Sequence, residues 1–209
     1  MMYVLKVLIS MSFLCLEWLI ICRLEPVYKK CLRVAAAPAT VYLAIAAAFI
    51  NGKVGDSIYG SIYFATIIFT ALCDFYTTEV YDWSWGIAGV TGIGILFYRG
   101  TAREVFFQLL IFIVLQALLF RKFYGGADCM AFSVSAIYLC SREKGIYDYL
   151  VVMLLTFAVL AVVQLIKNNI NRKGNLKKPV ALIPYIAAVM LFMEVKEWFT
   201  QFAVQNINR

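Results

Sequence analysis

The chain has 209 residues, of which 64% are hydrophobic and 15% are charged, and its mean hydropathy is +0.84. This composition lies far outside that of soluble domains and predicts an integral membrane protein. The net charge of +7 would suit nucleic acid binding. In a multispanning protein, however, Lys and Arg gather in cytoplasmic loops, so we expect no nucleic acid partner.

Apolar stretches long enough to cross about 30 Å of hydrocarbon recur along the chain, separated by short polar joints. They predict an all-α, polytopic membrane bundle of about eight transmembrane helices, with residues 1–209 forming a single domain. The first stretch lacks a basic leading region and a small-residue cleavage site, so we expect a retained helix rather than a secretory signal. In chain order, the predicted spans are 3–22, 34–50, 57–73, 83–98, 105–120, 127–140, 149–166 and 179–195.

Basic residues are distributed unevenly over the joints between these spans. Eleven Lys and Arg lie in the first, fifth and seventh joints, whereas seven lie on the opposite side. The positive-inside rule therefore predicts a multi-pass cell membrane protein with both termini outside. The strongly basic seventh joint, KNNINRKGNLKKP, also indicates contact with anionic membrane lipid.

The third joint, CDFYTTEVYDW, shares the cytoplasmic side but carries Asp74, Glu79 and Asp82 and no basic residue. Asp74 closes the third span and Asp128 opens the sixth, so both are expected near the cytoplasmic face. Two carboxylates that approach closely cannot both ionise cheaply, and they share a proton. One can then take a proton from water while the other protonates a peptide carbonyl, which is aspartyl protease chemistry.

A plainer interpretation is that each aspartate caps a helix. Asp is a favoured cap, and its charge suits a helix N-terminus, which fits Asp128 and Asp82. Asp74 ends a span, where the helix dipole disfavours an anion. Two functional alternatives also stay open: a small transporter or channel in which Asp74 and Asp128 bind a proton or cation, and a non-catalytic membrane assembly protein.

The stretch YGGAD, residues 124–128, resembles the GxGD motif of the type IV prepilin leader peptidases, which are membrane aspartyl proteases. Gly125 and Asp128 match the first and last motif positions, and Ala127 replaces the second glycine. Gly125 and Gly126 also let the backbone approach a neighbouring segment closely.

Two further stretches resemble this family. DFYTTEVYD is similar to the pattern D-x-x-x-x-x-I-P-[D/N], with Asp74 first, Tyr81 in place of proline and Asp82 last. KPVALIPYIAAVML is similar to a proline-containing run near the family's C-terminus, through Pro179, Pro184 and Tyr185. The three partial motifs occur in the family's order, within residues 57–191.

The resemblance implies a peptidase in which Asp74 and Asp128 are catalytic. It implies a prepilin-like membrane precursor as partner, cut on the cytoplasmic side after a short basic leader, which Glu79 and Asp82 suit by charge. Met130 stands where many bacterial members have lysine, and no CxxC pair occurs, so the resemblance is to the compact, peptidase-only members. No cofactor or metal is implied. The residues expected to support the motif or the substrate are Gly125, Gly126, Ala127, Glu79, Asp82 and Pro184.

Other intramembrane polar groups and glycines have structural interpretations. Glu17, Gln108, Gln116 and Gln164 are predicted to form hydrogen bonds between helices. Gly86, Gly89, Gly92 and Gly94 are predicted to allow close helix packing in the fourth span.

Overall fold

The computed structural model describes residues 2–24, 28–50, 54–77, 79–170 and 180–207. These residues form eight α-helices and one 3₁₀ turn, and no strand occurs among them, which confirms the predicted all-α fold. Pro179 and most of the basic seventh joint lie outside the described residues. In chain order the helices are α1 (Met2–Leu24), α2 (Tyr28–Phe49), α3 (Val54–Thr77), α4 (Asp82–Arg99), α5 (Arg103–Leu118), η1 (Phe120–Lys122), α6 (Gly126–Ser141), α7 (Ile146–Ile170) and α8 (Ile183–Ile207).

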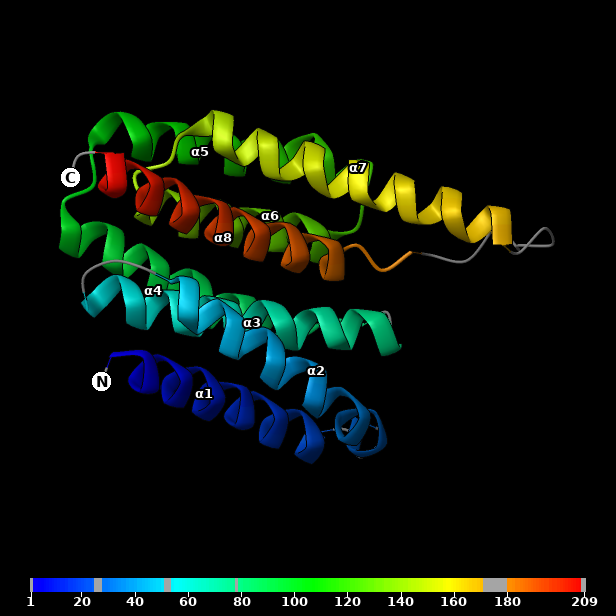
Figure 1. Ribbon diagram of the computed structural model, residues 1–209. Coiled ribbons are helices and arrows are strands. Elements are labelled where there is room, and N and C mark those ends of the chain that lie inside the picture. Colours follow the sequence, from blue (N-terminus) through cyan, green and yellow to red (C-terminus); the bar gives the residue numbers. More distant parts are fainter. Residues whose placement is uncertain (1, 25–27, 51–53, 78, 171–179, 208–209) are drawn as a thin grey trace.

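Successive helices run antiparallel, so the two chain termini lie at the same end of the bundle (Figure 1). We call this the termini end. At the opposite end, α3, α5 and α7 finish and α4, α6 and α8 begin. We call it the aspartate end, because Asp74 in the last turn of α3 and Asp128 in the first turn of α6 lie there.

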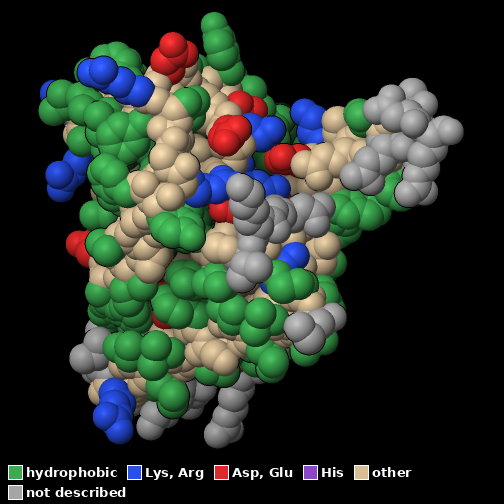
Figure 2. All heavy atoms as spheres, turned by 90° about the vertical axis from the view of Figure 1, so that its left-hand side faces the viewer, with side chains coloured by type: hydrophobic (Ala, Val, Ile, Leu, Met, Phe, Trp, Pro, Cys, Tyr) green, Lys and Arg blue, Asp and Glu red, His purple; other side chains and the backbone are tan. Residues whose placement is uncertain are grey.

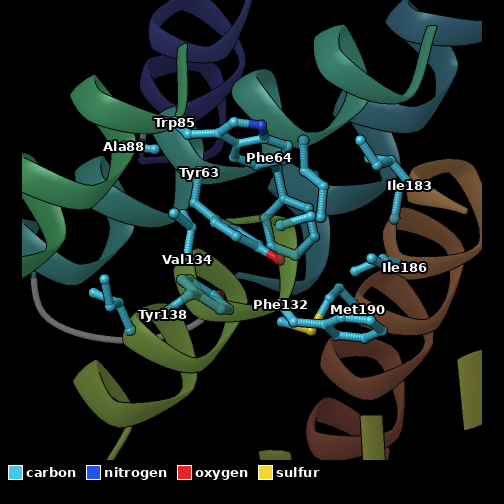
Figure 3. Close-up of a cluster of buried hydrophobic side chains, with 14 of the residues drawn as sticks. Tyr63, Phe64, Trp85, Ala88, Phe132, Val134, Tyr138, Ile183, Ile186 and Met190 are labelled. Atoms are coloured by element: carbon cyan, nitrogen blue, oxygen red, sulfur yellow. The ribbon is translucent and has the colours of Figure 1, made fainter. Parts of the chain in front are cut away.

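Helix α3 is the centre of the bundle. In its apolar stretch 72% of the residues are buried, against 22% in α1 and α7 and 17% in α5. It packs against α1, α2, α4, α6 and α8. Tyr63 of α3 stacks on Tyr138 of α6, with ring centroids 4.4 Å apart, and its hydroxyl lies 2.8 Å from the Ser135 hydroxyl. Figure 3 shows these rings enclosed by residues of α4 and α8. The same core therefore fixes the positions of α3, α6 and α8 relative to one another.

Four of the described helices are long and apolar enough to cross a membrane: Met2–Arg23, Gly55–Thr77, Arg103–Lys122 and Ile146–Lys167. The expectation of about eight such helices was therefore too high. Val34–Phe49 and Gly126–Ser141 are apolar but short. The 16 residues of α6 rise about 24 Å, less than a typical hydrocarbon core. In α4 apolarity is diluted by its first turn and glycines, and in α8 by Glu194, Lys196 and Glu197.

The outer faces of several helices carry large apolar side chains. Leu19, Val90, Phe97, Phe107 and Leu154, from α1, α4, α5 and α7, each expose more than half of their surface. A soluble monomer rarely presents apolar surface on so many sides. Such faces suit contact with lipid tails.

Candidate active site at the aspartate end

Asp74 is held by the start of another helix. It lies in the last turn of α3, where its own helix dipole disfavours an anion, yet it is 9% exposed. The backbone N–H of Ile183, the first residue of α8, donates to its Oδ2 at 3.1 Å, and the N–H of Leu182 is a second donor. Two N–H groups that α8 cannot use internally are thus satisfied by this carboxylate. The N-terminus of α8 compensates for the unfavourable end of α3.

Asp128 is the third residue of α6, which has Gly125 as its N-cap. Its carboxylate accepts a hydrogen bond from the backbone N–H of Gly125. This is the return half of a capping box, in which the third residue satisfies the N–H of the cap. A Cβ atom on Gly125 would lie 3.6 Å from Asp128 Oδ2, so the carboxylate rests against this glycine. The capping interpretation of Asp128 is therefore supported by the structure.

Capping does not account for the whole arrangement, because Asp74 and Asp128 also lie at the same end of two helices in contact. Helices α3 and α6 are in contact, and the negative charge of Asp74 acts on Asp128. Among the described residues, no Lys or Arg forms an ion pair with either carboxylate. Two acidic groups from distant parts of the sequence thus lie at the same end of a membrane-like bundle.

All three stretches that carry the family resemblance meet at this point. Asp74 comes from the first stretch, Gly125 and Asp128 come from the second, and Ile183 and Pro184 come from the third. Pro184 follows Ile183 in the first turn of α8, a position that lacks an N–H without cost. Its neighbour can therefore still donate to Asp74.

The other expected support residues lie around this pair. Gly126 begins α6, and a Cβ atom there would lie 3.8 Å from Arg121 Nε. Ala127 is partly buried against the core. Glu79 and Asp82 are exposed in the α3–α4 joint and the first turn of α4. Both residues are therefore accessible at the aspartate end.

The expected capping role of Asp82 is wrong. The N-cap of α4 is Tyr81, whose side chain makes no capping hydrogen bond, and Asp82 is the first helical residue. The extended backbone of Tyr81, with φ −88° and ψ 126°, starts the helix one residue earlier than the sequence pattern suggests. Asp82 then acts on α4 only through its charge.

Two features of the site were missed from sequence. The donors from Leu182 and Ile183 are backbone N–H groups, which nearly every residue type has, so the sequence does not indicate them. The available signal for a helix start was Pro184 after an apolar pair. The second feature is an apolar groove between α2, α3 and α8, lined by Phe75 and Pro184 next to the Asp74 contacts. Its lining residues are unremarkable for a membrane helix.

Acidic residues at the termini end are arranged differently. Asp56 pairs with Arg99, whose guanidinium also donates to the Ser141 carbonyl. Glu194 accepts a hydrogen bond from the Tyr138 hydroxyl at 2.8 Å and lies 3.5 Å from Arg142. A view onto this end shows basic and acidic side chains close to one another, surrounded by hydrophobic ones (Figure 2). Glu197 completes the network through contacts to Arg142 and Lys144.

The predicted hydrogen bonds between helices are confirmed for three of the four polar residues. Glu17 of α1 accepts from Thr66 of α3 at 3.3 Å. Gln108 of α5 accepts from the N–H of Ile146, where α7 begins, at 2.9 Å. Gln116 of α5 donates to the Met153 sulfur of α7 at 3.2 Å. It also accepts from the Tyr124 hydroxyl at 2.7 Å, which ties α5 to the start of the second stretch of the resemblance.

Within the described ranges, no group of three or more His, Cys, Asp or Glu residues could hold a metal ion. No family model matches the chain, and no curated protein or solved structure matches it. The functional assignment therefore depends on the residues of the site and on the partial motifs that converge there.

Proposed function

We propose that the protein is a membrane aspartyl endopeptidase that removes the short cytoplasmic leader from type IV prepilin-like precursors. The observation that carries this proposal is that Asp74 and Asp128 lie at the same end of the bundle, on helices α3 and α6 that contact each other, with no cation paired to either among the described residues. The attachment of α8 to Asp74 supports it, because the third stretch of the family resemblance thereby reaches the same point.

The hydrogen bonds divide the roles of the two carboxylates. Asp74 accepts two backbone N–H groups at the start of α8, and such donors stabilise an anion. We assign Asp74 as the base that takes a proton from the attacking water. Asp128, which has one backbone donor and faces the charge of Asp74, carries the proton that passes to the carbonyl oxygen of the scissile peptide. When the tetrahedral adduct collapses, the C–N bond breaks, the leaving amine takes the proton held by Asp74, and a hydroxyl of the adduct returns a proton to Asp128, so both carboxyl groups regain their starting states.

We further propose that all eight helices lie in the cell membrane, with the aspartate end toward the cytoplasm. The antiparallel arrangement and the shared position of the termini support this topology (Figure 1). The bilayer can thin around short helices such as α6 at a modest cost per ångström. The excess of Lys and Arg in the first, fifth and seventh joints favours the same orientation.

The test is incubation of the purified full chain with a prepilin-like precursor in detergent or liposomes, followed by mass analysis for loss of the leader. Asp148 offers a matched control. It is the third residue of α7, and it accepts a hydrogen bond from the N–H of Gly145 at 3.3 Å, the same capping arrangement as Asp128 but at the termini end. We expect Asp148→Asn to cleave like the wild type and Asp128→Asn to be inactive.

Three outcomes would count against the proposal. If the wild type leaves the precursor intact, the peptidase assignment fails. If Asp128→Asn and Asp148→Asn cleave equally well, Asp128 is only a cap. If instead the wild type in liposomes conducts protons or cations, and Asp74→Asn and Asp128→Asn abolish this flux without any cleavage, the pair belongs to a transporter.

A further inference from the structure

A groove of about 530 Å³ opens between α2, α3 and α8. Its wall includes Tyr42 from α2, Ala71 and Phe75 from α3, and Pro184 and Ala188 from α8. The lining is almost entirely apolar, and Ala188 is exposed within it. Unlike the convex apolar faces of α5 and α7, this surface is hollowed and can receive side chains from another helix.

The groove begins at residues that adjoin Asp74 and its donor in the sequence. Phe75 follows Asp74 on α3, and Pro184 follows Ile183, whose N–H donates to the Asp74 carboxylate. From Pro184 the groove extends along α8 through Ala188 to Val195, toward the termini end. An extended object in it would therefore have one end beside Asp74 and the remainder along the bundle.

We propose that this groove binds the apolar helix of the precursor, with the leader junction next to Asp74. This inference rests on the proposed peptidase function and specifies where that substrate lies. Small side chains let helix backbones approach closely in a membrane, and Ala71, Ala187 and Ala188 provide them along both walls.

Charge at the same end of the bundle suits this occupant. Glu79 and Asp82 are exposed at the aspartate end, where the leader would emerge. Acidic side chains attract a basic leader. A helix with a basic segment at one end thus matches both the apolar groove and the acidic α3–α4 joint.

Disulfide cross-linking tests the location without requiring turnover. Ala188→Cys is introduced into the inactive Asp128→Asn chain and mixed with a precursor that carries one cysteine in the first turns of its apolar helix. The matched control is Ala161→Cys, because Ala161 is also an exposed alanine but lies on α7, outside the groove. The Asp128→Asn chain without either change measures cross-linking to the native cysteines. We expect a cross-link with Ala188→Cys only.

A second pair of variants connects the groove to cleavage. Ala188→Trp in the active chain fills the groove, so we expect KM for the precursor to rise about tenfold or more with kcat nearly unchanged. Ala161→Trp should leave both constants within about twofold of the wild type.

The outcomes separate the two proposals. Cleavage by the wild type without a cross-link to Ala188→Cys, and with normal KM in Ala188→Trp, would overturn the groove assignment and leave the peptidase function standing. A cross-link without any cleavage by the wild type would support the groove and refute the peptidase. A loss of bound phospholipid in Ala188→Trp, with unchanged KM, would identify the groove as a lipid site and overturn the inference.

Discussion

The buried carboxylates at the two ends of the bundle have different kinds of partner. At the termini end, Asp56 pairs with Arg99, and Glu194 lies against Arg142 and the Tyr138 hydroxyl. At the aspartate end, Asp74 and Asp128 lie on helices that contact each other, and among the contacts described they accept only backbone N–H groups. Paired charges stabilise a fixed arrangement, whereas two neighbouring carboxylates retain a proton that can move. The first arrangement is typical of structure and the second of chemistry.

Asp128 and Asp148 make the same contrast within one local motif. Both are the third residue of a helix, and both accept a hydrogen bond from the N–H of the glycine before it. Only Asp128 has a second carboxylate acting on it. Local sequence therefore explains the cap, and tertiary contact between α3 and α6 distinguishes the two positions.

The largest expected effect is on cleavage at the aspartate end. Asp74→Asn and Asp128→Asn should each reduce kcat by about 10⁴-fold or more, and the double variant should be scarcely worse, because residues that act as one unit are not additive. The amide is nearly the same shape as the carboxylate, so all three variants should insert and fold. Single-turnover cleavage of the precursor and thermal unfolding in detergent are the measurements.

Additive losses of kcat in the two single variants would contradict the idea that Asp74 and Asp128 act as one unit. If each single variant lost only about tenfold and the double variant lost the product, the two carboxylates would act independently. The acidic pair would then be two separate caps that happen to be near each other.

The next largest effect is on stability at the termini end. Removing one partner of a buried ion pair leaves an uncompensated charge, so Arg142→Ala should lower the free energy of unfolding by about 3 kcal/mol. Its side chain is 8% exposed and that of Glu194 is 3% exposed. Cleavage per folded molecule should change little, because α6 separates the two ends by about 24 Å. Thermal unfolding and cleavage are measured on the same preparation.

A matched pair of variants sharpens this prediction. Arg103→Ala removes an exposed arginine at the same end and should change the free energy of unfolding by about 0.5 kcal/mol or less. Arg142→Met combined with Glu194→Met should recover part of the loss, since apolar groups replace both charges. Arg142→Ala with full stability and no cleavage would show that the termini end takes part in the chemistry.

Sequence patterns predicted the features that depend on composition and order. Hydropathy predicted an all-helical bundle, and the order of the spans predicted that Asp74 and Asp128 lie at the same end. The pairing of α8 with Asp74 could not be predicted, because its donors are backbone groups brought in across 109 positions of sequence. The number of helices long enough to span a membrane was overestimated, because short apolar spans such as 127–140 were counted, and the 16 residues of α6 remain too short.

The glycine series in α4 shows the same limit. All four glycines were predicted to allow close packing, but only Gly92 does so tightly: a Cβ atom there would lie 2.2 Å from the Tyr59 hydroxyl and 2.5 Å from Ile137. Gly86 and Gly94 have nothing within 4 Å, and Gly89 has only Val134, at 4.0 Å. Which glycine meets a neighbour depends on how α4 rotates against α3 and α6, and that rotation has no simple sequence signal.

Gly92→Ala tests whether α4 packs tightly against α3 and α6 in the core between the two ends of the bundle. The added methyl group would push Tyr59 and Ile137 apart, so we expect the free energy of unfolding to fall by about 2 kcal/mol. Gly94→Ala is the control, and it should be neutral or slightly stabilising because alanine favours the helix. Thermal unfolding of both variants is the measurement. Equal stability of the two variants would mean that α4 moves aside freely and that the core between the ends is loose.

The smallest effect is expected for a change of Asp82. This variant distinguishes electrostatic attraction of the leader from catalysis of the cleavage step. Asp82 is exposed in the first turn of α4, where a carboxylate stabilises the helix dipole by about 0.5 kcal/mol, so Asp82→Asn should barely change thermal unfolding. Its cleavage of a precursor with a basic leader should show KM raised about twofold at low salt, with kcat unchanged, because only an exposed attraction is lost. That difference should vanish at about 1 M salt, where the screening length is about 3 Å.

A precursor whose leader is neutral should be cut equally by wild type and variant at any salt. If Asp82→Asn instead lowered kcat as strongly as Asp128→Asn, Asp82 would take part in the reaction. The distinction between the acidic α3–α4 joint, which attracts the leader, and the catalytic pair would then be wrong.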